Sequence, residues 1–448
     1  MTSTFTSLQS NPKYTRPMFT AHISQALQTK EYWIDDNSSI KKQATKQMHT
    51  GIAKRLSVDI HSFMDALESA DEHTAFSYGV HDESLPDEIT ITTKRNENPA
   101  QNRYSRSRSH YHYSKGAGIM MFDLDPSPFG PALSVNDFLT VWESIDPQCT
   151  KATQLIRGSI SSGVHLKNEP SPFPDNAHIY IWVANAQDIP RYTKTLANRL
   201  WLAGYGFYAL SANGGFLDKT VFDLSVFSPE HLDFVGAPQL LDPRLLYSPP
   251  KMIFEERGLL QTAYLQDLDN DELYALDALK QTMRANMRQK SLDKRADYNT
   301  QQIAKMVARD IPVADAKETL SRMEREAGSL YDDYLLIFSD GIGEVTVRDV
   351  LNNPEKYTNK TLYDPLDGLA SSPTVAQYYY NVASDTHIIH SFAHGGANYY
   401  LDLSALGIRK KTSKKKEFNS MASNTPPYLT AYPVNQTGLL LILPKKNR

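Results

Sequence analysis

The middle of the chain contains short apolar runs that predict β-strands. Residues 118–125 (GIMMFDLD), 155–162 and 178–183 (HIYIWV) are rich in β-branched and aromatic side chains and are bounded by Gly, Pro, Ser or Asn. Two further strands are expected at 207–210 and 220–224, joined by an Asn-Gly-Gly turn. These runs predict one sheet that collects several segments of the sequence.

One segment within this region has helical periodicity. Tyr192, Leu196 and Leu200 recur every four residues, so they line one face of a helix. Asp188 stands where an N-cap is expected, and Gly204 ends the pattern. The sequence therefore predicts a helix between the third and fourth strands.

The chain divides into three parts by pattern. Residues 1–245 are expected to form a catalytic α/β-patterned domain, residues 250–340 a polar helical domain, and residues 341–448 a small β-rich C-terminal module. The consecutive prolines at 249 and 250 mark the first boundary. The predicted class for the whole chain is α+β.

Composition limits the cellular setting and the kind of partner. The net charge is −4, so a nucleic-acid contact must come from a local basic patch. The single cysteine, Cys149, excludes an internal disulfide and a cysteine-rich zinc site, which fits a reducing compartment. The N-terminal residues do not have the pattern of a secretory signal, and no apolar run approaches the roughly 18 residues of a membrane helix. We expect a cytoplasmic protein with no membrane contact.

Three acidic residues form the main candidate for chemistry. Asp123 and Asp125 are two apart on a predicted strand, so both carboxylates point to the same face. Asp223 lies within a second apolar run, where an unpaired charge would be unfavourable. Carboxylates that converge can hold Mg²⁺ or Mn²⁺. The structural alternatives are solvent-facing aspartates before a proline turn and a core-edge aspartate bonded to the backbone.

Two further segments offer groups that bind phosphate. Residues 157–165 (RGSISSGVH) form a Ser/Gly-rich turn whose hydroxyl and N–H groups can contact a phosphate. His178 begins the next strand and can donate a hydrogen bond to a triphosphate or to leaving pyrophosphate. A single histidine is more often a structural residue, and that alternative stays open.

Three arginines precede the first of these strands. Arg103, Arg106 and Arg108 alternate with aromatic and polar residues in a stretch that predicts an exposed loop. Cationic and aromatic side chains in such an arrangement can bind a single strand of DNA by charge and stacking. A solvated basic loop is the alternative.

The order of these motifs resembles that of the archaeo-eukaryotic primase superfamily, in its bacterial branch of phage, plasmid and other mobile-element primase-polymerases. The matching stretches include MMFDLDPS, RGSISSGVHL, HIYIWV and VFDLSVFSPEHLDFVGAP, and the likeness covers about residues 76–240. The resemblance implies a catalytic core with an RNA-recognition-like fold, a bound NTP or dNTP and a two-metal site. It assigns Asp123, Asp125 and Asp223 as ligands of Mg²⁺ or Mn²⁺ and as the catalytic residues.

The serine-x-histidine motif of that family maps onto two places. His165 matches by its local sequence, whereas His178 matches because it begins a strand, and we favour His178 as the phosphate-binding residue. Ser161 or Ser162 would supply the hydroxyl. His231 stands where relatives often have an arginine.

The resemblance also implies partners. A primase-polymerase copies a single-stranded DNA template, and many relatives carry their own C-terminal helicase. This sequence contains no G-x-x-x-x-G-K-[ST], so we expect a separate replicative helicase.

The function expected from the sequence is that of a DNA primase-polymerase of a mobile genetic element. One alternative is a catalytically inert replication initiator or DNA-binding protein on the same fold. Another is a rolling-circle endonuclease, for which His110, Tyr111 and His112 give only a partial match because such motifs prefer an aliphatic residue between the histidines.

Overall fold

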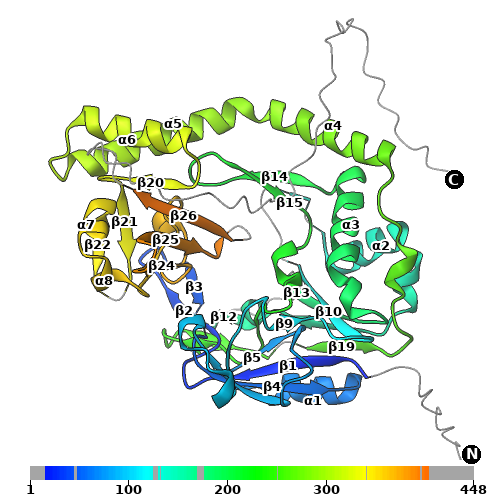
Figure 1. Cartoon of the computed structure of the whole chain (residues 1–448). Helices are drawn as coiled ribbons and strands as arrows, with labels where there is room; N and C mark the ends of the chain where they lie inside the picture. The colour runs from blue at the N-terminus through cyan, green and yellow to red at the C-terminus, as the bar shows by residue number, and fades with distance from the viewer. Residues whose placement is uncertain are drawn as a thin grey trace, which may run out of the picture. The chain divides into compact units, whose positions relative to one another are not determined.

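The structure is a computed structural model that describes residues 16–44, 48–124, 130–131, 133–168, 176–249, 251–339, 341–393 and 396–402. These residues form several sheets and eight α-helices, so the expected mixed α+β class is confirmed (Figure 1). None of the helices found in these ranges combines the length and the apolar character needed to cross a membrane. Contacts group the chain up to Ser404 into one unit.

The largest sheet has ten strands from widely separated segments. Along its main path the order is β19-β11-β13-β10-β1-β4-β7-β8, and β5 joins both β1 and β16. Most pairs are antiparallel, whereas β1–β10 and β7–β8 are parallel. The ten strands are β1 (Met18–Ile23), β4 (Gly51–Ser57), β5 (Thr74–Ser77), β7 (Glu88–Thr92), β8 (Arg103–Ser105), β10 (Gly118–Leu124), β11 (Gln154–Gly158), β13 (Ala177–Val183), β16 (Asp233–Phe234) and β19 (Met252–Glu255).

Strands β10 and β13 lie inside this sheet and are buried on both faces, which explains their nearly continuous apolar sequences. On one face Phe122 packs against Phe138 and Trp142 of α2 (Val135–Ile145), and the same core includes α3 (Ile189–Leu202). On the other face Phe63 of α1 (Ile60–Ser69) packs against Tyr180. Figure 1 shows α1 and the pair α2–α3 on opposite sides of the sheet.

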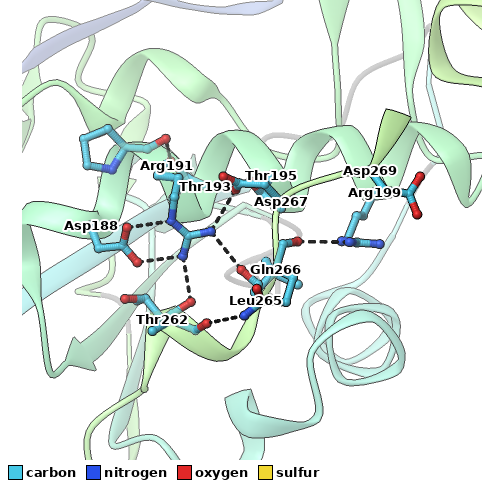
Figure 2. A network of polar contacts seen from close by, with 12 residues as sticks. Asp188, Arg191, Thr193, Thr195, Arg199, Thr262, Leu265, Gln266, Asp267 and Asp269 are labelled. Atoms are coloured by element: carbon cyan, nitrogen blue, oxygen red, sulfur yellow. Dashed lines mark hydrogen bonds and ion pairs between the residues drawn. The ribbon is translucent and has the colours of Figure 1, made fainter. Parts of the chain in front are cut away.

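An arginine network attaches α3 to the chain that leads into the helical region. Asp188 occupies the predicted N-cap position, but its carboxylate accepts hydrogen bonds from Nε and Nη2 of Arg191, both at 2.7 Å. Arg191 also donates to the carbonyl oxygens of Thr262 and Leu265 and to Asp267 (Figure 2). All the N–H groups of the Arg191 guanidinium thus hold the start of α3 and residues 262–267 together.

The helical region follows. It contains α4 (Asn270–Asn286), α5 (Arg288–Val307) and α6 (Val313–Arg325), and Met287 caps both α4 and α5. Helix α4 packs against the hairpin formed by β14 (Phe207–Leu210) and β15 (Phe216–Lys219), where Lys280 forms an ion pair with Asp218 at 2.6 Å. The predicted hairpin strand at 207–210 and the helical region are therefore present.

The C-terminal residues of the described chain form a second, seven-stranded sheet with its own core. Its order is β20-β26-β25-β24-β23-β21-β22, and its first two strands in sequence lie before residue 340. Two short helices, α7 (Val347–Asn352) and α8 (Pro354–Tyr357), belong to this part. The strands are β20 (Ser329–Tyr331), β21 (Leu335–Phe338), β22 (Gly343–Thr346), β23 (Thr361–Leu362), β24 (Ala376–Asn381), β25 (Thr386–Ser391) and β26 (Ala397–Asp402).

Small sheets and single turns complete the description. The remaining strands are β2 (Lys30–Ile34), β3 (Ile40–Ala44) and β17 (Gln239–Leu240) in one sheet, β12 (Val164–Leu166) with β18 (Leu245–Tyr247), and β6 (Val80–His81) with β9 (Tyr111–His112). The 3₁₀ turns are η1 (Lys94–Asn96), η2 (Pro99–Gln101), η3 (Pro147–Lys151), η4 (Ile160–Gly163), η5 (Ala186–Asp188), η6 (Leu224–Phe227), η7 (Thr262–Tyr264) and η8 (Gly368–Ala370).

One predicted strand is wrong. Residues 220–224 form a bend that leads into η6. The hydroxyl of Thr220 donates to the carbonyl oxygen of Phe222 at 3.0 Å, and the Asp223 carboxylate accepts from the N–H of Ser225 at 2.9 Å. These local side-chain bonds to the backbone compete with strand pairing.

Candidate functional site

The candidate site is built where β10 and β13 run side by side. Asp123 and His178 are directly opposite each other in the antiparallel register. Strand β11 pairs with the other edge of β13, and there Arg157 is opposite His178. Period-two geometry places the Asp123 side chain on the α1 face of the sheet, opposite to Phe122. His178 Nε2 lies 3.6 Å from Asp123 Oδ1. The structure thus brings two of the predicted site residues together.

A fourth aspartate completes this cluster, and sequence reasoning missed it. Asp233 is 3% exposed, and its Oδ1 lies 3.2 Å from His178 Nδ1. Its Oδ2 accepts hydrogen bonds from Tyr78 at 2.5 Å and from Tyr180 at 2.9 Å. The signal that could have found it is Leu232-Asp233-Phe234, a charge inside a short apolar run.

The electrostatics of this cluster favour a charged pair. Burial lowers the pKa of His178, but the carboxylates of Asp233 and Asp123 outweigh it and raise that pKa above its ordinary value. Burial raises the pKa of Asp233, but the His178 charge and the hydrogen bonds from His178 and Tyr78 bring it well below its ordinary value. Both carboxylates therefore favour the protonated form of His178.

Asp223 approaches Asp123 through the backbone. Its N–H donates to the carbonyl oxygen of Asp123 at 3.3 Å, which joins the start of η6 to the end of β10. The half-buried Asp223 carboxylate caps η6 through Ser225. Asp223 thus reaches the neighbourhood of Asp123 from a turn instead of from the predicted strand.

The donor set is suited to a hard cation. Asp123 and Asp223 offer carboxylate oxygens, which Mg²⁺ and Mn²⁺ prefer. Asp125, the third predicted ligand, lies outside the described residues. Within the ranges that the structure describes, no three His, Cys, Asp or Glu side chains are grouped as a metal site.

The Ser/Gly-rich turn is confirmed as a turn and contains η4. Ser162 donates its hydroxyl to the carbonyl oxygen of Ser159 at 2.6 Å, which is a local structural bond. The hydroxyl of Ser161 instead accepts from the ammonium group of Lys42, 3.4 Å away on β3. The structure thus places a cation beside Ser161 that the sequence did not indicate, and phosphate binding by this turn stays a prediction.

The two candidate histidines are placed differently. His165 belongs to β12, where its Nε2 lies 3.0 Å from the Ser248 hydroxyl and its Nδ1 3.0 Å from the carbonyl oxygen of Leu166. His178 faces Asp123. Of the two, only His178 is paired with a predicted metal ligand, and its preference as the phosphate-binding residue stays a prediction.

The three arginines do not share an exposed loop. Arg103 is exposed on β8, but a guanidinium N–H of Arg106 donates to the carbonyl oxygen of Glu230, and burial lowers the pKa of Arg106. Arg108 contacts the hydroxyl of Ser228 at 2.9 Å and the carboxylate of Glu230 at 3.0 Å. Arg106 and Arg108 both contact the segment that follows η6. Arg108 lies in an exposed turn, as predicted, whereas the predicted exposed loop is wrong for Arg103, which lies on a strand, and for Arg106, which is half-buried.

Compared with models of protein families, with curated proteins and with solved structures, the chain matches none. The primase resemblance therefore depends on the sequence motifs themselves, and a functional conclusion depends on the geometry of the site.

Proposed function

We propose that this chain is a DNA primase-polymerase of a mobile genetic element, which transfers nucleotidyl groups from NTP or dNTP to a 3′-hydroxyl on a single-stranded DNA template. The observation that supports the proposal is the pairing of Asp123 with His178 across two buried strands, with Asp223 bonded to the Asp123 backbone. Three segments that are far apart in the sequence supply these groups, in the motif order described above. A separate helicase would open the template.

In this proposal each residue has a defined task. Asp123, Asp125 and Asp223 would hold two divalent cations, which when bound neutralise the developing charge on the phosphates. The cationic His178 and the Ser161 hydroxyl would bind the triphosphate. The 3′-hydroxyl releases its proton to solvent and its oxygen forms a bond to the α-phosphorus. The bond between the α-phosphorus and the oxygen that bridges to the β-phosphate breaks, and pyrophosphate leaves with that electron pair.

A catalytically inert initiator or DNA-binding protein is the second candidate. It is favoured by the structural role of Asp223, whose carboxylate caps η6. The endonuclease alternative is weaker because Tyr111, an aromatic residue, stands between His110 and His112, where such motifs prefer an aliphatic residue.

The test is primer extension and de novo priming on single-stranded templates with labelled NTPs or dNTPs, in Mg²⁺ and in Mn²⁺. Asp123→Asn combined with Asp223→Asn should abolish incorporation, while circular dichroism shows an unchanged fold. Asp65→Asn, an exposed position on α1, is the matched control and should keep wild-type activity.

Incorporation at the wild-type rate by the double variant would exclude the proposed mechanism. Duplex binding that survives the double substitution, together with no incorporation by the wild type in either metal, would favour the inert initiator.

A further inference from the structure

A buried carboxylate contacts the ring nitrogen of His178 that Asp123 does not contact. Nδ1 of His178 lies 3.2 Å from Asp233 Oδ1, whereas Nε2 lies 3.6 Å from Asp123 Oδ1. We propose that Asp233 is a positioning residue that fixes the His178 ring, so that Nε2 is presented to the phosphates of the nucleotide. This inference rests on the proposed function, since it assigns a role in the same site.

The surroundings of Asp233 explain how the carboxylate is held. Asp233 lies on the two-residue strand β16, directly opposite Phe76 of β5. Tyr78 stands two residues after Phe76 in the sequence. The hydroxyls of Tyr78 and Tyr180 both donate to Oδ2, which leaves Oδ1 for His178. Two residues beyond Asp233, the carbonyl oxygen of Val235 accepts from the Arg157 guanidinium at 2.9 Å.

This arrangement favours a proton on Nδ1 in either protonation state of the ring. An ionised carboxylate only accepts hydrogen bonds, and Asp233 Oδ1 has no other donor beside it among the described residues, so the group that faces it across 3.2 Å is the Nδ1–H of His178. The Tyr180 hydroxyl, 3.4 Å from the same nitrogen, already donates to Asp233, as does Tyr78, so these hydroxyls fix the carboxylate. A histidine that is held through one nitrogen presents the other in a defined direction.

A buried carboxylate is unfavourable unless it is paired, and an apolar side chain would fill the same space without that cost. The chain contains a comparable case that does not involve the site. Asp146 is also 3% exposed and accepts a hydrogen bond from the hydroxyl of Tyr192 at 2.6 Å. Asp146 therefore provides a control for the structural effect of losing a buried Asp–Tyr bond.

The first experiment is a double-mutant cycle on the full chain. Asp233→Asn leaves one acceptor oxygen for three donors, so His178 loses its fixed partner. We expect a decrease in kcat/KM of about 10–100-fold, the range typical for groups that orient a functional histidine. His178→Ala should produce a similar decrease, and Asp233→Asn added to it should cause little further loss, because both act through one ring.

Asp146→Asn is the matched control. It should lower the melting temperature without changing kcat/KM, and its effect should remain independent of His178→Ala. Decreases by Asp233→Asn and His178→Ala that multiply in the double variant would overturn the inference, because a merely structural aspartate would act independently of His178.

The second experiment does not depend on activity. Nitrogen-15 NMR of the histidine rings, with His178 assigned through His178→Gln and recorded at a pH where the ring is neutral, should show the Nδ1–H tautomer in the wild type and a mixture of tautomers in Asp233→Asn. An unprotonated Nδ1 in the wild type, or ring signals unchanged by Asp233→Asn, would overturn the inference even if the variant proved unstable. Absence of incorporation by the wild type would instead exclude the proposed function and leave the ring signals as the test of positioning.

Discussion

The arginines before strand β10 show that residues of one type in one stretch can have different roles. Arg106 is half-buried and bonded to the Glu230 carbonyl, whereas Arg103 is exposed on β8. Arg106→Ala should therefore destabilise the protein by about 2 kcal/mol, as expected when a hydrogen bond from a half-buried charged group is lost. Arg103→Ala should change stability by less than about 0.5 kcal/mol.

Urea denaturation measures both stability effects, and binding of single-stranded DNA at two salt concentrations separates the roles. If Arg103 contacts a phosphate, its alanine variant should bind more weakly and with a smaller salt dependence. Equal stability losses for the two variants would contradict the burial difference.

His22 predicts an acid-sensitive fold. The side chain is fully buried, its Nε2 lies 2.9 Å from the Ser77 hydroxyl, and burial, with the nearby charges of Arg106 and His81, lowers its pKa well below the ordinary value. Below about pH 6.5 the unfolded chain binds a proton at this position that the folded chain does not. Stability should therefore be highest above that pH and fall as the solution becomes more acidic, by up to about 1.4 kcal/mol per pH unit.

Urea unfolding between pH 5.5 and 8 measures this slope. His22→Gln should reduce it by the contribution of one proton. A slope that is the same in the wild type and in His22→Gln would show that His22 can be protonated in the folded state.

At the scale of elements, the network around Arg191 attaches helix α3 to the segment that leads into α4. Its guanidinium holds Asp188 and Asp267 as well as two carbonyl oxygens, and a lysine ammonium cannot reproduce this planar fork. Arg191→Lys should cost about 1–2 kcal/mol, a value reduced for partial solvent exposure.

Hydrogen exchange should become faster at residues 262–267 in this variant, because their carbonyl and carboxylate groups lose a fixed donor. Lys194→Ala, at an exposed position on the same helix, is the control. Unchanged exchange in Arg191→Lys would contradict a role for the network in holding this segment.

Some secondary-structure elements could be predicted from the sequence and others could not. The runs 118–125 and 178–183 and the four-residue period of 192–200 gave strands and a helix correctly, because burial imposes a pattern that does not depend on distant partners. The run 220–224 has an equally apolar pattern, but side-chain bonds at Thr220 and Asp223 turn the chain there. Local hydrogen bonds of this kind do not appear in a hydrophobic pattern.

The site was predicted only in part for a related reason. Asp123 and His178 could be expected on neighbouring strands, but their exact pairing depends on the register of β10 with β13. Asp233 was not predicted as a site residue, because its partners Tyr78 and Tyr180 come from elements far away in the sequence. Its pairing therefore follows from the tertiary contact alone.

At the scale of the whole molecule, the described chain contains separate hydrophobic cores. The core around Phe122 and Tyr180 belongs to the large sheet, and that around Tyr334 and Tyr378 belongs to the C-terminal sheet. All the predicted site residues that the structure describes come from the part before residue 245. The proposed chemistry therefore belongs to the part of the chain that contains the large sheet.

Metal binding connects this site with the stability of the whole chain. A cation that binds only the folded state stabilises it by about 1.4 kcal/mol at ten times its Kd and by about 2.7 kcal/mol at one hundred times. Mn²⁺ or Mg²⁺ should therefore raise the melting temperature of the wild type by a few degrees. The Asp123→Asn, Asp223→Asn double variant should lose this shift, since its amides are weaker ligands than carboxylates.

The direction in which the double substitution changes the metal-free melting temperature distinguishes a metal site from a structural pair of carboxylates. Carboxylates grouped to hold cations repel one another when no cation is bound, so their removal should leave the metal-free melting temperature equal or higher, apart from the loss of the Asp223 cap and of the Asp123–His178 pair. Scanning calorimetry at several metal concentrations, with Asp65→Asn as the control, measures both quantities. A metal-dependent shift of equal size in the wild type and the double variant would place the cation elsewhere and remove the electrostatic basis of the proposed catalysis.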